Sequence, residues 1–391
     1  MYRLATCFWV SDCTHSTGFV GCAMRIVFWQ NCLSPHQLPY IVRLLDDNRV
    51  DEVVVVAGTS ISNDRKRMGW ELPQYNGIEK CQVHVMPNDK LIGSILSARQ
   101  EDSWHLFSGI RADAFVFHCI KMSMDLTLRR GIITELPCTY DFKRNIENAK
   151  PLWMHRIRFR LQDYKYAKHM KAVFAMGTAA VNYFKSINKH WDVFNFSYCT
   201  EPSVQQVSVN GKTRFLFVGS LSIRKNPIAI INAYNDMKSK DLLCNIEFIG
   251  NGDLRKLLDE KIENEHLQDK ITALGKKSQT DIPHYLAKTD VLILPSLHDG
   301  WGAVVNEALQ AGCYTIVSDD CGAKTLLEED SRLGLIFNHK NTAELSRCMD
   351  YVVSNIDKIR RDRDYRKKWA DDHISGRVLA KYMVDCLESV K

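Results

Sequence analysis

Residues 292–312 read LILPSLHDGWGAVVNEALQAG. A short apolar run stops at Pro295, a loop with two glycines follows, and a helix-forming segment begins near Gly302. This order predicts a buried parallel strand, a turn and a helix, the repeating unit of a doubly wound α/β sheet. The start of such a helix offers unpaired backbone N–H groups to an anion, and Gly300 and Gly302 let a ligand approach the main chain.

The alternation of strand and helix extends over most of the chain. In the C-terminal part we expect strands at 213–218, 245–249, 270–273, 291–294 and 314–317, with helices at 227–237, 254–262, 282–287 and 303–310. In the N-terminal part we expect strands at 25–29, 51–57, 114–117 and 172–175, with helices at 39–45 and 179–186. Two such units predict an α/β protein with two doubly wound Rossmann-like domains facing across a cleft.

The 391 residues are enough for two domains, because single cores stop growing at about 250 to 300 residues. We expect residues 24–205 to form the N-terminal domain and residues 206–375 the C-terminal domain. Residues 1–23 are interpreted as a disordered or non-native extension, since polar residues interrupt the apolar region that a signal peptide needs.

Composition excludes several classes of protein. The net charge of +6, from 52 Lys and Arg against 46 Asp and Glu, is too small for a nucleic-acid binder. No apolar run approaches the roughly 18 residues that a membrane span needs. The 13 cysteines form no C-x-x-C pair and no zinc-type cluster, so we expect reduced thiols in a cytosolic protein and no metal site.

Two carboxylates stand out in the quoted stretch. Asp299 and Glu307 lie eight positions apart across the loop–helix junction, which does not suit an acid–base pair on one helix face, so we assign them to holding hydroxyl groups. The stretch resembles the E-x7-E signature of glycosyltransferase family 4, P-S-x-x-E-G-F-G-x-x-x-x-E-A, with Asp299 at the first Glu and Trp301 at the Phe.

Three further segments resemble motifs of the same family, in the same order. They are FVGSLSIRKN at 217–226, FIGNGD at 248–253, and ITALG at 271–275 followed by IPHYL at 282–286. The resemblance implies a GT-B fold, retention of anomeric configuration, and no metal or cofactor. It also implies that the C-terminal domain holds a nucleotide-sugar donor of the UDP or GDP type, that the N-terminal domain holds the acceptor, and that residues 376–391 form a helix crossing back to the N-terminal domain.

The resemblance also assigns roles to single residues. It places Lys225 on the donor diphosphate, Glu307 on the ribose hydroxyls and Asp299 near the transferred sugar. The family's arginine falls on Ser220, which carries no charge, so Arg224 is expected to substitute for it. The donor-binding set is Gly219, Arg224, Lys225, Gly250, Gly275, Lys276, Asp299, Gly300, Trp301, Gly302 and Glu307. The residues expected to act in catalysis are Lys225, Asp299, Glu307 and His118.

His118 is included because it follows the predicted strand at 114–117, where the family often has a histidine facing the sugar; a satisfied core histidine is the alternative. The positive groups would stabilise charge on the leaving phosphate, as catalysis of this bond cleavage requires. The phosphate itself would take the acceptor proton, so no general base is named.

Between positions 150 and 171 seven Lys or Arg oppose only Asp163, and Trp153, Ile157, Leu161 and Tyr164 form one helix stripe. The segment predicts either a peripheral contact with an anionic membrane or a surface helix that packs its stripe on its own domain.

The sequence therefore predicts a glycosyltransferase that transfers a hexose-type sugar to a saccharide or lipid-linked glycan acceptor at the cytoplasmic face of a membrane. Its expected role is in the synthesis of cell-surface polysaccharide. A GT-B protein that binds nucleotide without turnover is the main alternative. An NAD-dependent oxidoreductase should show G-x-G-x-x-G after the first strand, where this chain has Trp29-Gln-Asn-Cys. A phosphorylase or epimerase on the same fold is a further alternative.

Overall fold

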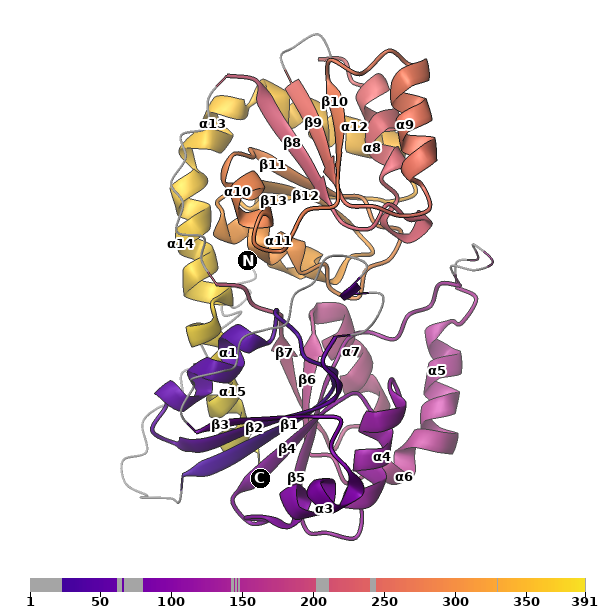
Figure 1. Ribbon diagram of the computed structural model, residues 1–391. Helices are drawn as coiled ribbons and strands as arrows, with labels where there is room; N and C mark the ends of the chain where they lie inside the picture. Colours follow the sequence, from indigo (N-terminus) through magenta and orange to yellow (C-terminus); the bar gives the residue numbers. More distant parts are fainter. Residues whose placement is uncertain are drawn as a thin grey trace, which may run out of the picture.

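The computed structural model describes residues 23–61, 65–66, 80–141, 144, 146, 148–201, 211–239, 244–328 and 330–390. Residues 1–22 of the predicted extension lie outside the described residues, and so do residues 202–210, which contain the expected domain boundary. The described chain forms two halves, one above the other in Figure 1.

The N-terminal half is built on a seven-stranded parallel sheet in the order β3-β2-β1-β4-β5-β6-β7. Its strands are β1 (Met24–Cys32), β2 (Val50–Thr59), β3 (Cys81–Val85), β4 (Ser103–Ser108), β5 (Arg129–Thr134), β6 (Ala172–Met176) and β7 (Asp192–Phe196). Its helices are α1 (Leu38–Arg43), η1 (Leu44–Asp46), α3 (Asp89–Ser97), α4 (Ala114–Ser123), α5 (Leu152–Arg158), η2 (Phe159–Asp163), α6 (Tyr164–Ala167) and α7 (Thr178–Ile187).

The C-terminal half repeats this plan with six parallel strands in the order β10-β9-β8-β11-β12-β13. Its strands are β8 (Thr213–Val218), β9 (Cys244–Ile249), β10 (Ile271–Gly275), β11 (Val291–Leu294), β12 (Tyr314–Ser318) and β13 (Gly334–Phe337). Its helices are η3 (Ile223–Lys225), α8 (Ile228–Asn235), α9 (Arg255–Asn264), α10 (Ile282–Ala287), α11 (Val304–Gln310), η4 (Gly322–Leu326), α12 (Thr342–Ser354), α13 (Ile356–Arg361), α14 (Arg363–Ile374) and α15 (Gly376–Ser389).

Both sheets are buried on both faces, which explains their apolar strands. Residues 26–29 of β1 and 53–57 of β2 have no exposed surface, and alternate side chains of each strand enter apolar clusters on opposite faces of the sheet. Parallel strands covered by helices on both sides are expected to be continuous apolar runs of this kind. The two doubly wound sheets predicted from the sequence are therefore present.

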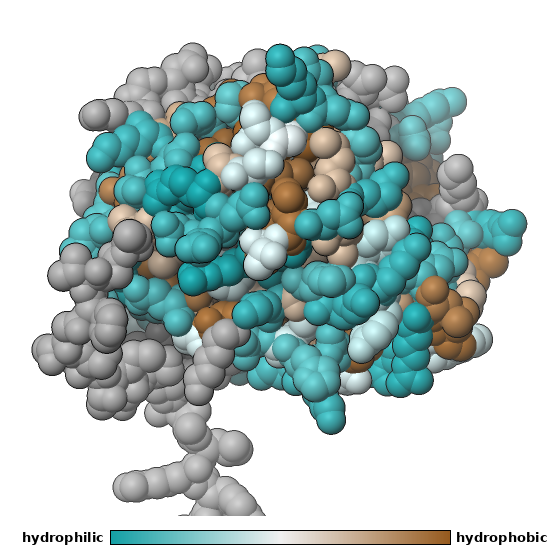
Figure 2. Space-filling view, turned by 90° about the horizontal axis from the view of Figure 1, so that it is seen from below, coloured by the Kyte–Doolittle hydropathy of each residue, from teal (hydrophilic) through white to brown (hydrophobic). Residues whose placement is uncertain are grey.

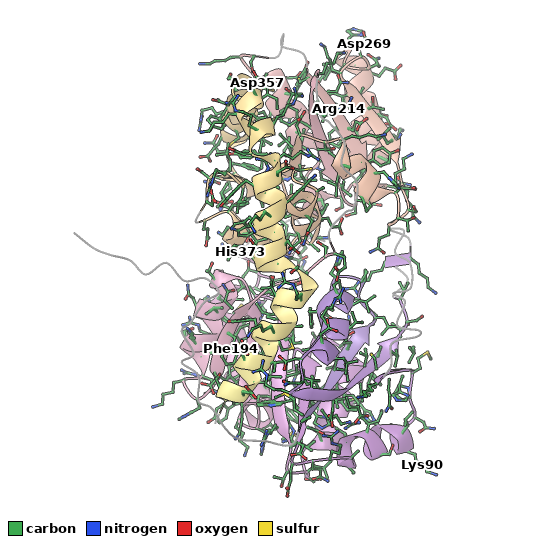
Figure 3. The ribbon with its side chains drawn as sticks, turned by 90° about the vertical axis from the view of Figure 1, so that its left-hand side faces the viewer. Lys90, Phe194, Arg214, Asp269, Asp357 and His373 are labelled. Atoms are coloured by element: carbon green, nitrogen blue, oxygen red, sulfur yellow. The ribbon has the colours of Figure 1, made fainter. Side chains whose placement is uncertain are left out.

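The C-terminal helix α15 packs against the N-terminal half. Arg49 forms ion pairs with Asp385 at 2.8 Å and Glu388 at 2.6 Å, and the ring of Tyr382 stacks on Phe196 with centroids 6.4 Å apart. In Figure 3 the helices that end the chain run along one side of both halves, past His373. The last helix thus ties the two halves together.

The predicted strand at 114–117 is wrong, because these residues begin helix α4. The Asp113 carboxylate accepts hydrogen bonds from the backbone N–H groups of Phe115 at 2.9 Å and Val116 at 3.2 Å, which is an N-cap. Buried Val116, Cys119 and Ile120 then follow helical spacing. The neighbouring strand is β4, and the sequence patterns also missed β3, β5, β7 and β13.

The cysteines in the described part of the chain are free thiols, most of them buried. No described helix has both the length and the apolar character that crossing a membrane requires.

Candidate active site

The loops after β8 and β11 lie at the point where the C-terminal sheet reverses its order. β8 and β11 are neighbours, but the chain continues from β8 toward β9 and from β11 toward β12, on opposite sides. The loop after β8 carries Arg224 and Lys225, and the loop after β11 carries Asp299. Open α/β sheets bind ligands outside the carboxyl ends of the strands at such a switch point.

A cavity of about 350 Å³ lies at this switch point, between the two halves. The predicted residues that line it are Gly219, Arg224, Lys225, Gly250, Lys276, Asp299, Trp301, Gly302 and Glu307. The N-terminal half contributes Ser34, His36, Arg65, Glu135 and Tyr198 to its wall. Both halves of the chain therefore contribute side chains to one site.

Asp299 joins both basic side chains of the β8 loop. The Lys225 ammonium donates a hydrogen bond to Asp299 Oδ2, and the Arg224 guanidinium lies 3.4 Å from Asp299 Oδ1. Arg224 also donates to the carbonyl of His298 at 3.3 Å. Burial acts to raise the pKa of the Asp299 carboxyl, but the charges of Lys225 and Arg224 outweigh it and hold the pKa below its usual value. Two cations and one carboxylate leave the cluster with net positive charge.

Backbone contacts hold the loop around Asp299. Its N–H donates to the carbonyl of Asp320 at 2.9 Å, and its carbonyl accepts from Gly322 N–H at 3.0 Å. Trp301 is 2% exposed, and its Nε1 donates to Asn306 Oδ1 at 2.7 Å. Gly302 has φ of +92°, which favours glycine. The loop is therefore preorganised before any ligand arrives.

Glu307 lies on α11 and faces the cavity. Burial raises the pKa of its carboxyl to about 7. His36 Nδ1 lies 3.7 Å from Glu307 Oε1, but burial and then Arg65 lower the pKa of His36 to about 4. His36 is therefore neutral near pH 7 and forms no ion pair with the carboxylate. A half-buried carboxylate that pairs with no Lys or Arg among the described residues is suited to accept hydrogen bonds from ligand hydroxyl groups.

The other predicted glycines have mainly backbone roles. A side chain on Gly250 would lie 1.8 Å from the carbonyl oxygen of Gly219, and Gly250 N–H donates to the carbonyl of Gly275 at 2.9 Å. Gly275 and Gly300 are not among the residues lining the cavity. Lys276 does line it, and its Nζ donates to the carbonyl of Lys66 at 3.2 Å.

The structure places His118 away from this site. It lies on α4, its side chain is 41% exposed, and its Nε2 lies 2.9 Å from Asp89 Oδ1 on α3. It lines neither the 350 Å³ cavity nor its neighbour. The strand expected before it is instead the start of α4, and the residue that follows the next strand, β5, is Glu135.

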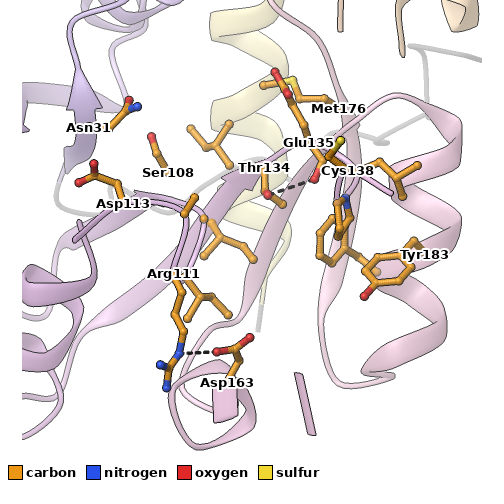
Figure 4. Close-up of a pocket in the computed structure, with 18 of the residues that line it drawn as sticks. Asn31, Ser108, Arg111, Asp113, Thr134, Glu135, Cys138, Asp163, Met176 and Tyr183 are labelled. Carbon is orange, nitrogen blue, oxygen red and sulfur yellow. Dashed lines mark hydrogen bonds and ion pairs between the residues drawn. The ribbon is translucent and has the colours of Figure 1, made fainter. Parts of the chain in front are cut away.

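A second cavity of about 520 Å³ adjoins the first and is lined by the N-terminal half. Figure 4 shows Glu135 and Cys138 on one side of it, Asn31 and Asp113 on another. The sequence patterns missed Glu135, which follows a strand of the sequence RRGIIT. The Ile-Ile-Thr run before Glu135, with Pro137 after it, could have indicated a strand that ends just before this carboxylate.

Residues 201–369 match the family model of glycosyl transferases group 1. This match covers the C-terminal half, including Lys225, Asp299 and Glu307. Among relatives, alpha-D-kanosaminyltransferase of Streptomyces kanamyceticus is 24% identical over 140 residues, 36% of each chain. UDP-Gal:alpha-D-GlcNAc-diphosphoundecaprenol alpha-1,3-galactosyltransferase of Escherichia coli is 30% identical over 119 residues, 30% of each chain. The matches thus span about a third of these relatives' length.

Solved structures extend the likeness beyond the group 1 match. The Anabaena protein HepE in complex with UDP superposes with a TM-score of 0.68 at 15% identity, covering 94% of this chain and 100% of HepE. A second HepE structure holds UDP-glucose, with a TM-score of 0.66. This likeness shows the fold: two Rossmann-like domains in the GT-B arrangement, as the sequence predicted.

Proposed function

We propose that this protein is a retaining, metal-independent glycosyltransferase that transfers a hexose-type sugar from a nucleotide diphosphate to a saccharide or lipid-linked glycan. The observation that carries the proposal is the cluster of Lys225, Arg224 and Glu307 in one cavity between two Rossmann-like domains. The group 1 match over residues 201–369 covers these three side chains and supports the same activity.

The chemistry of the cluster fits a sugar diphosphate. When the sugar leaves, negative charge grows on the diphosphate, and Lys225 and Arg224 are fixed cations beside it. Each charge-assisted hydrogen bond contributes about 1.5 to 3 kcal/mol. Donor binding would shift these cations from Asp299 toward the phosphates, which leaves Asp299 available to sugar hydroxyls. The Glu307 carboxylate would accept hydrogen bonds from the ribose.

The donor base stays open between uridine and guanosine. The HepE complexes with UDP and UDP-glucose favour uridine. The Escherichia coli relative, whose name includes a diphosphoundecaprenol-linked sugar, supports a lipid-linked acceptor. Such an acceptor would fit a role in cell-surface polysaccharide synthesis. The 520 Å³ cavity of the N-terminal half is the proposed acceptor site.

The helical segment α5–η2–α6 supports a peripheral membrane contact at the cytoplasmic face. Its stripe does not pack on its own domain: Trp153 is 61% exposed, Ile157 49% and Leu161 79%. Figure 2 shows a mostly hydrophilic face with apolar atoms in its middle and at its right edge, and the right edge is the side on which α5 lies in Figure 1. Basic side chains beside an exposed apolar stripe suit an anionic lipid surface.

A vesicle experiment tests this contact. Replacing Trp153, Ile157 and Leu161 together by Ser should abolish sedimentation with vesicles that contain phosphatidylglycerol. Leu257→Ser is the matched control, because Leu257 is 48% exposed on α9 of the other half. Equal sedimentation of the triple variant and the control would contradict the proposed membrane contact.

Turnover with a panel of UDP- and GDP-sugars tests the main proposal. Hydrolysis or transfer should occur with one donor class, and the matching nucleotide should raise the melting temperature. Lys225→Ala should reduce kcat by about a hundred- to a thousandfold, the usual cost of losing one transition-state stabiliser. Full activity of this variant would contradict the role of Lys225.

A nucleotide-binding protein without turnover is the second candidate. Two observations favour it: Ser220 supplies no charge, and Asp299 already pairs with both Lys225 and Arg224. Nucleotide binding without cleavage of any donor would select this alternative.

A further inference from the structure

The two cavities of the cleft meet at a small set of side chains. Four residues line both the 350 Å³ cavity and the 520 Å³ cavity: Ser34, Arg65, Glu135 and Tyr198. The first cavity holds the cations and Glu307, and the second belongs to the N-terminal half. A sugar that passes from a donor in the first cavity to an acceptor in the second must cross between them at this junction.

Glu135 is the carboxylate at this junction, and its position is fixed. The hydroxyl of Tyr198 donates a hydrogen bond to Glu135 Oε1 at 2.9 Å. Glu135 Oε2 lies against the backbone of Gly300, where an added Cβ would come within 1.8 Å of it. Although Gly300 does not line the cavity, its lack of a side chain matters for Glu135. The missing side chain makes room for the Glu135 carboxylate.

The electrostatics distinguish Glu135 from the other two acids of the site. Asp299 is paired with Lys225 and Arg224, and Glu307 lies in the first cavity only. Burial raises the pKa of Glu135, and its neighbour Asp299 adds to the rise, while the hydrogen bond from Tyr198 opposes it. Other charges that face Glu135 are His298 and Arg65, which lower its pKa.

We propose that Glu135 is a catalytic residue, whose carboxylate faces the transferred sugar and stabilises the positive charge that develops at its anomeric carbon. This inference rests on the proposed function. Glycosyl transfer passes through a state in which the bond to the leaving group is long and the sugar ring carries positive charge. A fixed anion in a cleft shielded from water stabilises such a charge far more than it would in solution.

This role needs no proton transfer and no covalent bond to the enzyme. The bond between the anomeric carbon and the diphosphate oxygen breaks, the bond to the acceptor oxygen forms, and the acceptor proton goes to the leaving phosphate. Glu135 stays ionised throughout. Tyr198 acts through Glu135, to which its hydroxyl donates, and is therefore a positioning residue.

Glu135→Gln tests the proposal, because the amide keeps the size of the side chain and can still accept from Tyr198. With the donor that wild type cleaves, we expect kcat to fall about a hundred- to a thousandfold, with the donor KM changed less than about threefold. Melting-temperature shifts with nucleotide should match wild type. Glu101→Gln, at an exposed turn, is the matched control.

Two supporting variants probe the same carboxylate indirectly. Gly300→Ala should also lower kcat by displacing Glu135, and Tyr198→Phe should lower it by about tenfold. A Glu135→Gln protein with kcat within threefold of wild type, or with a change in KM alone, would overturn the inference and leave the proposed function intact. Failure of wild type to cleave any nucleotide sugar would overturn the proposed function and this inference with it.

Discussion

Replacing Glu307 by Gln should change how the stability of the protein depends on pH. In the folded chain the pKa of Glu307 is about 7, whereas the ordinary value is 4.5. Between these values the folded state keeps a proton that the unfolded state loses, so stability falls as pH rises. The Gln variant cannot ionise and lacks this part of the fall.

The expected size follows from the pKa difference. Between pH 5 and pH 8 the buried carboxyl would lower the free energy of unfolding by about 2 to 3 kcal/mol. This is an upper limit, because the Glu307 side chain is 24% exposed and solvent screens part of the effect. For 391 residues it corresponds to a melting-temperature difference of about 3 °C. Variant and wild type should therefore melt together at pH 5, and the variant should melt about 3 °C higher at pH 8.

Differential scanning calorimetry at pH 5, 6, 7 and 8 would measure the difference. The titration of His36 is present in both proteins and cancels in the comparison. Glu101→Gln is the control and should follow wild type at every pH, because Glu101 is exposed. A variant-minus-wild-type difference that is the same at pH 5 and pH 8 would refute an uncompensated buried carboxyl at position 307.

Two further predictions concern stability. Gly250→Ala should lower the free energy of unfolding by more than about 2 kcal/mol, because the added Cβ would lie 1.8 Å from a backbone oxygen. Gly93→Ala on α3 is the control: its Cβ meets nothing within 4 Å, so it should raise the free energy of unfolding by about 0.5 to 1 kcal/mol. Urea unfolding of both variants measures these changes. Asp290→Ala should lower the free energy of unfolding by about 3 to 5 kcal/mol, because it leaves Arg360 without the carboxylate that it binds at 2.9 Å. Asp364→Ala, at a 94% exposed site, should change the free energy of unfolding by less than about 1 kcal/mol. Equal effects of the two variants in thermal unfolding would contradict the buried Asp290–Arg360 pair.

Local sequence was sufficient for most of the C-terminal half. Its strands are short apolar runs separated by turn residues, so pattern and propensity agree with burial on both faces of the sheet. The stretch at 292–312 specifies its own strand, loop and helix, and it placed Asp299 and Glu307 in the cavity. Strand β13, GLIF, begins with a glycine, which has low strand propensity, and its two central residues are only half-buried, so its signal is weaker than that of the fully buried β11.

The N-terminal half depended more on tertiary context. A four-residue apolar run at 114–117 fits a strand or a helix equally, and the Asp113 cap decides for the helix. β4 contains buried His105, a polar residue that is accommodated because Trp29 Nε1 donates to its Nδ1 at 3.2 Å. That contact joins residues 76 positions apart, beyond what local patterns can show.

Sequence by itself determined the fold class and the residue types in the loops after β8 and β11, because those depend on one strand–loop–helix unit at a time. Only the tertiary structure decided that Glu135 lies against Gly300, that Asp299 holds both Lys225 and Arg224, and that the stripe on α5 is exposed. The first contact joins the two halves, and the second joins the loops after β8 and β11 within one half. The physical reason is that contact between distant strand ends depends on how the halves pack, which no single segment encodes.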